Sequence, residues 1–117
     1  MEPTLTQAEI ADRITILELK DKHRVIAACS EVEYLKSHCY APPELLDELR
    51  EANAAGWDSK QALADHFDGD KKLSEHELAV VIEGGYAAGK RRARIKYQIW
   101  LHTGGPLEAK SWVFALA

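Results

Sequence analysis

Apolar side chains recur every three or four residues over the first third of the chain. The series follows Thr6-Gln-Ala-Glu9, a capping box whose Thr hydroxyl and Glu carboxylate accept hydrogen bonds from free N–H groups at a helix start. This spacing keeps one stripe on one helix face, so it predicts a single long first helix of about eight turns. The stripe consists of Ile10, Ile14, Leu17, Asp21, Val25, Ala28, Val32 and Leu35. A second, adjacent stripe, made of Ile16, Leu19 and Ile26, requires packing partners on two sides of this helix.

The rest of the chain carries the signals of three further helices. Pro42-Pro43 ends the first helix and starts a short one that Gly56 terminates, and a second short helix is expected over 58–67. Ser74-Glu-His-Glu77 is another capping box and opens the last helix. Three glycines, at 84, 85 and 89, leave open whether that helix continues to Gly104-Gly105-Pro106 or breaks on the way.

These elements predict an all-α fold with one domain over residues 1–117. We expect a small helical bundle in which the long first and last helices pack antiparallel. The segment Trp112–Ala117 is apolar, and we expect this tail to dock on the bundle or on a neighbouring subunit. Long helices with apolar stripes in so short a chain favour a homodimer or a higher homo-oligomer.

Composition and charge narrow the classes of function. The formal net charge is −4, but residues 1–83 carry 9 basic and 18 acidic side chains, whereas residues 84–117 carry 6 basic and 1 acidic. Most of the molecule would repel phosphate, which disfavours nucleic acid as a partner. The longest apolar runs are far shorter than the ~20 residues of a membrane span, so no membrane association and a cytoplasmic location are expected. Cys29 and Cys39 lie about 15 Å apart along the predicted first helix, too far for a disulfide.

Two motifs resemble known ligand-binding sites but lack residues that those sites require. Gly84-Gly-Tyr-Ala-Ala-Gly89-Lys90 matches the start of a phosphate-binding P-loop, yet Arg91 replaces the Ser or Thr that binds Mg²⁺. Asp68-Gly-Asp70 resembles part of a calcium loop, but Lys71 stands where that loop needs glycine. The five histidines show no zinc-site spacing. We therefore predict no catalytic residue, no metal site and no cofactor.

One cluster of cations stands out, from Lys90 to Lys96. On a helix, Arg92 falls on the apolar side with Ala88, Ile95 and Ile99, so its guanidinium should point inward and meet a carboxylate or a bound anion. Asp21, within the apolar stripe of the first helix, is the expected protein partner. The alternatives are an internal ion pair, the floor of an anion site, or a cluster that forms only a solvated helix face. The candidate ligand-binding residues are Lys90, Arg91, Arg92, Arg94, Tyr86, Tyr97, Trp100, Asp21 and Arg24.

Three segments resemble a family of small uncharacterised helical proteins of bacteria and phages. Asp12-Arg-Ile-Thr-Ile-Leu-Glu-Leu-Lys20 is similar to the opening signature of that family, Asp-Lys/Arg-Ile/Leu-Thr-Ile-Leu-Glu-Ile/Leu-Lys. Leu49–Trp57 resembles its middle segment and Gly85–Lys96 its last helix. The resemblance implies a helical fold and a location in a bacterial or phage-infected host cell. It implies no activity.

Three functions follow from these observations. The first is a non-enzymatic protein that binds or sequesters an anionic small molecule, such as a nucleotide signal, through its basic and aromatic last helix. The second is a protein–protein adaptor or inhibitor that uses the apolar stripe and the tail. The third is a small helical enzyme that acts on a dicarboxylate.

Overall fold

The computed structural model describes residues 5–104, and within that range it contains four helices and no strand. The helices are α1 (Gln7–Lys22), α2 (Cys29–Ser37), α3 (Pro43–Phe67) and α4 (Glu75–Thr103). The prediction of an all-α bundle is confirmed. Both predicted capping boxes are formed, by Thr6 with Glu9 before α1 and by Ser74 with Glu77 before α4. The apolar tail lies outside the described residues.

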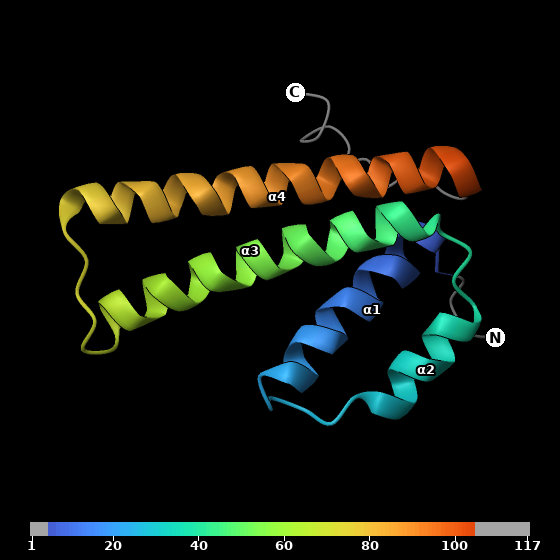
Figure 1. Cartoon of the computed structure of the whole chain (residues 1–117), viewed down its shortest axis with the longest axis horizontal. Helices are drawn as coiled ribbons and strands as arrows, with labels where there is room; N and C mark the ends of the chain where they lie inside the picture. Colours follow the sequence, from blue (N-terminus) through green and yellow to red (C-terminus); the bar gives the residue numbers. More distant parts are fainter. Residues whose placement is uncertain (1–4, 105–117) are drawn as a thin grey trace.

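The two longest helices, α3 and α4, form an antiparallel hairpin that dominates the bundle (Figure 1). Helix α1 packs on the half of this hairpin that holds the start of α3 and the end of α4, and it runs in the opposite sense to α4 but steeply inclined to it. Helix α2 packs on α1. The other half of the hairpin extends beyond α1, and no other helix of residues 5–104 lies beside it (Figure 1).

The first helix is much shorter than its apolar stripe predicts. It ends at Lys22 because the chain closes a Schellman motif: the N–H of Arg24 donates to Asp21 O and the N–H of Val25 donates to Lys20 O. Arg24 adopts the left-handed conformation that this motif requires, with φ 58°. The later members of the stripe, from Ala28 onward, therefore belong to α2 and its entry.

Two other predictions about helix ends need correction or completion. Gly56 does not end a helix, since α3 continues through it to Phe67 and replaces the two expected short helices. Helix α4 passes through all three of its glycines. A Cβ at Gly85 would lie 3.2 Å from Ser59 Cβ, so glycine at this position lets α3 and α4 approach closely.

The buried side chains form two clusters that share α1. One consists of Ala8, Ala11, Leu49, Ala52, Ile95 and Ile99, between α1, α3 and α4. The other consists of Ile10, Ile14, Leu17, Ala28, Val32 and Leu35, between α1 and α2 with its entry. Helix α1 thus has neighbours on two sides, but its predicted second stripe belongs to neither cluster: Ile16 and Leu19 are half-buried and Ile26 is 42% exposed. Among the described residues, no helix is both long and apolar enough to span a membrane.

Candidate functional site

A buried polar cluster joins α1, α3 and α4. Its centre is the Asp12 carboxylate, which is 10% exposed and accepts hydrogen bonds from both Nε (2.9 Å) and Nη2 of Arg92. The Asn53 Nδ2 group donates to Asp12 Oδ1 at 3.1 Å and to Thr15 Oγ1 at 2.6 Å. The Nζ atom of Lys96 lies 4.0 Å from Asp12 Oδ2, and its side chain is 9% exposed. The cluster therefore ties all three helices together around one carboxylate.

The environment of Asp12 favours its ionised form. Burial alone would raise the pKa of this carboxyl, but the hydrogen bonds and positive charge of Arg92 act in the opposite direction and prevail. The Asn53 hydrogen bond and the charge of Lys96 add to the effect. The net result is a pKa for Asp12 below its ordinary value of 3.8.

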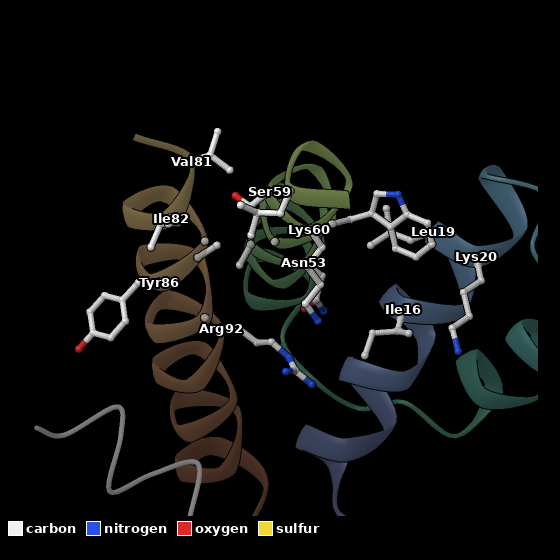
Figure 2. Close-up of a pocket in the computed structure, with 17 residues that line it drawn as sticks. Ile16, Leu19, Lys20, Asn53, Ser59, Lys60, Val81, Ile82, Tyr86 and Arg92 are labelled. Atoms are coloured by element: carbon white, nitrogen blue, oxygen red, sulfur yellow. The ribbon is translucent and has the colours of Figure 1, made fainter. Parts of the chain in front are cut away.

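Beside this cluster, the three helices enclose a groove of about 460 Å³, which we call the α1/α3/α4 groove (Figure 2). Its walls are mainly apolar, and Arg92 and Asn53 converge at one end (Figure 2). Trp57, in the wall formed by α3, stacks on His23 at the end of α1 with ring centroids 4.6 Å apart. The lining residues are Ile16, Leu19, Lys20, Ala52, Asn53, Gly56, Trp57, Ser59, Lys60, Leu63, Val81, Ile82, Gly85, Tyr86, Ala88, Gly89 and Arg92.

The charge of the groove opposes that of the whole protein. Three cationic residues line it, Lys20 from α1, Lys60 from α3 and Arg92 from α4, and no Asp or Glu does. Arg92 is bound to Asp12, but within residues 5–104 no ion pair joins Lys20 or Lys60 to a carboxylate. A groove with apolar walls and an excess of positive charge suits a ligand with an apolar body and an anionic group.

Of the nine residues predicted for the site, two line this groove. Arg92 meets a carboxylate, as expected, but its partner is Asp12 and the predicted pairing with Asp21 is wrong. The packing of α1 on α4 sets Arg92 opposite Asp12, whereas Asp21 Oδ1 accepts a hydrogen bond from Ala28 N at 3.3 Å, in the connection to α2. Tyr86 borders the groove, but Figure 2 shows its ring directed away from it.

The other predicted residues do not line the α1/α3/α4 groove. Arg24 lies in the turn after α1, and Arg91 pairs with Glu51 across α3 and α4 at 2.9 Å. Tyr97 and Trp100 stack on each other further along α4, with ring centroids 5.9 Å apart. Of the remaining cations, Lys90 is half-buried and Arg94 is exposed. Along the continuous helix α4, Tyr86, Lys90, Arg94, Tyr97 and Trp100 share one side, whereas Arg92 faces Asp12 on another.

Sequence reasoning did not assign Asp12, Asn53, Lys20 or Lys60 to the site. Asp12 and Lys20 begin and end the segment quoted for the family resemblance, but that resemblance brings no activity and gave them no role. One signal could have found the buried cluster. Asp12 and Thr15, Asn53, and Arg92 with Lys96 lie respectively in Asp12–Lys20, Leu49–Trp57 and Gly85–Lys96, the three segments whose family resemblance is an expectation from the sequence alone. These segments meet at one point in the fold.

The fold and the groove together define a small helical protein with a cation-lined interhelical groove. Comparisons with protein-family models, with curated proteins and with solved structures found no match to this chain. Within residues 5–104, no three His, Cys, Asp or Glu side chains are placed to hold a metal ion.

Proposed function

We propose that the protein binds an anionic small molecule with an apolar body in the α1/α3/α4 groove. One observation carries this proposal: a groove with mainly apolar walls is lined by three cations and no carboxylate, in a protein whose net charge is −4. Its volume of about 460 Å³ falls within the range of small-molecule sites, about 300–1,000 Å³. We therefore place the expected binding activity in this groove and not on the outer surface of the last helix.

The lining residues favour binding over catalysis. The lining includes Ser59 and Tyr86 but no Asp, Glu, His or Cys, so no carboxylate or imidazole in the groove could activate a nucleophile as a general base. The nearest carboxylate, Asp12, is bound by Arg92 and Asn53. These features support the non-enzymatic hypothesis rather than an enzyme that acts on a dicarboxylate.

The test measures binding of 8-anilinonaphthalene-1-sulfonate, a fluorescent anion with an apolar aromatic body. The double variant Lys20→Gln, Lys60→Gln should weaken its binding about 10-fold or more, since each lost ion contact is worth on the order of 1 kcal/mol near a surface. Lys22→Gln is the matched control, because Lys22 lies on the same helix, is exposed and does not line the groove. No binding to the wild type, or equal binding by the double variant, would contradict the proposed function.

A second candidate function, protein–protein association, rests on the half of the hairpin that extends beyond α1. Phe67 is 65% exposed and Val80 53%, on the two helices near the turn that joins them. Such side chains support a homo-oligomer or an adaptor that binds another protein. If so, the double variant Phe67→Glu, Val80→Glu should reduce the mass measured by sedimentation or abolish partner capture. An unchanged mass and unchanged capture would refute this candidate.

The family resemblance alone supports the proposed origin of the protein. On that ground we propose a cytoplasmic role in a bacterium or in a phage-infected host cell, where capture of an anionic metabolite would be one such role.

A further inference from the structure

Asn53 presents an unused acceptor at the cluster end of the groove. Asn53 is 9% exposed. Its Nδ2 group donates to two acceptors, Asp12 Oδ1 and Thr15 Oγ1, which determines which end of the amide is the nitrogen and which is the oxygen. Within residues 5–104, no group donates to Asn53 Oδ1. Leaving a buried carbonyl oxygen without a hydrogen-bond donor is energetically unfavourable, so a ligand in the groove that donates a hydrogen bond to Asn53 Oδ1 would be favoured.

Two helix-interior glycines leave the groove open for such a molecule. A Cβ at Gly89 would meet no atom within 4 Å, and a Cβ at Gly56 would make only an ordinary contact of 4.0 Å with Ala88. Neither glycine has a positive φ, so neither backbone conformation nor close packing requires glycine at these positions. Each weakens its helix relative to alanine. Both line the groove, where their effect is a smooth surface on α3 and α4.

We propose that the groove binds a planar ring that carries an N–H donor and an anionic substituent, the chemistry of a nucleobase joined to a phosphate. This inference rests on the proposed function and specifies its ligand. The ring lies on the surface of Gly56 and Gly89, its N–H donates to Asn53 Oδ1, and its anionic group meets Lys20 or Lys60. A flexible acyl chain has no donor for Asn53 and gains little from a smooth wall.

The first experiment compares ligands that share a phosphate and differ in the apolar body. The four nucleoside 5′-monophosphates and octyl phosphate compete for bound 8-anilinonaphthalene-1-sulfonate on the full chain. At least one nucleotide should displace the probe at a concentration 10-fold or more below that of octyl phosphate. If octyl phosphate is equal or better, or if no nucleotide displaces the probe, the ring assignment is overturned. The proposed function fails separately, when the probe itself does not bind or ignores Lys20 and Lys60.

The second experiment uses a matched pair of glycine variants on α4. Gly89→Ala and Gly84→Ala should both raise Tm by roughly 2–6 °C, because each removes a glycine from a helix without a steric clash. Of these two glycines, Gly89 lines the groove and Gly84 does not. We therefore expect Gly89→Ala to weaken nucleotide binding 5-fold or more and Gly84→Ala to leave it unchanged. Equal affinities of the two variants overturn the placement of the ring.

Asn53→Ala tests the donor in the same assay. It should weaken nucleotide binding 10-fold or more and leave displacement by octyl phosphate unchanged. Unchanged nucleotide binding overturns the role of Asn53 Oδ1, and if this variant does not fold, the glycine pair and the ligand comparison decide the proposal.

Discussion

Asp12 is the residue whose removal tests the packing of the bundle most directly. The substitution Asp12→Asn retains the shape of the side chain but removes the charge that balances Arg92 and Lys96. Breaking a buried ion pair costs about 3–5 kcal/mol. The Arg92 side chain is 41% exposed, so water compensates part of its loss, and we expect about 2–3 kcal/mol. This is a large share of the roughly 5–15 kcal/mol by which small domains are stable.

The pH dependence of stability provides a second readout of the same group. Because folding lowers the pKa of Asp12, its contribution is fully present above the unfolded value near 3.8 and is lost as the pH falls through the lower folded value. The wild-type protein should therefore lose stability below about pH 4. The Asp12→Asn variant should lose less over the same range, since it has no carboxyl to protonate at this position.

The assay is urea unfolding followed by circular dichroism at pH 7, 5, 4 and 3. Glu51→Gln is the control, because Glu51 pairs with Arg91 on the surface, is 70% exposed and should contribute at most about 0.5 kcal/mol. The reasoning is refuted if Asp12→Asn is as stable as Glu51→Gln at pH 7, or if its stability falls between pH 5 and 3 as steeply as that of the wild type.

Two further predictions concern the backbone. Arg24→Gly should stabilise the protein by about 1 kcal/mol, since Arg24 has a φ of 58° and glycine adopts this conformation without strain; a lower urea midpoint would show that the Arg24 side chain matters more than its backbone. Gly85→Val should cost about 1–3 kcal/mol by forcing α3 and α4 apart at Ser59; the check is thermal unfolding beside Gly84→Ala, and a Tm equal to that of the wild type would contradict the close approach.

The helix starts could be predicted from the sequence because their signals are local. The side chains that cap α1 and α4, Thr6 and Ser74, lie three residues from their partners, and no other part of the fold is needed to form these contacts. The ends of the helices were harder to predict from the sequence. Arg24 occupies a left-handed position where glycine is the usual signal, so nothing in the sequence marked the end of α1. Conversely, Gly56 suggested a stop that packing on α1 and α4 overrides.

In the candidate site, too, local features could be predicted from the sequence and contacts between helices could not. The position of Arg92 on the apolar side of its helix already required an anionic partner, which is a local inference from helical periodicity. Its choice of Asp12 over Asp21 depended on how α1 aligns with α4, and the periodicity of either helix is compatible with several alignments.

The sequence by itself determined the all-α class, the starts of the first and last helices and the inward turn of one arginine. Only the tertiary structure decided where α1 ends, which carboxylate Arg92 meets and how Lys20, Lys60 and Asn53 come to line one groove. The physical reason is the distance in sequence over which each effect acts. Capping and amphipathic periodicity act within one or two helical turns, whereas a groove between three helices exists only when residues up to 76 positions apart in sequence are packed together.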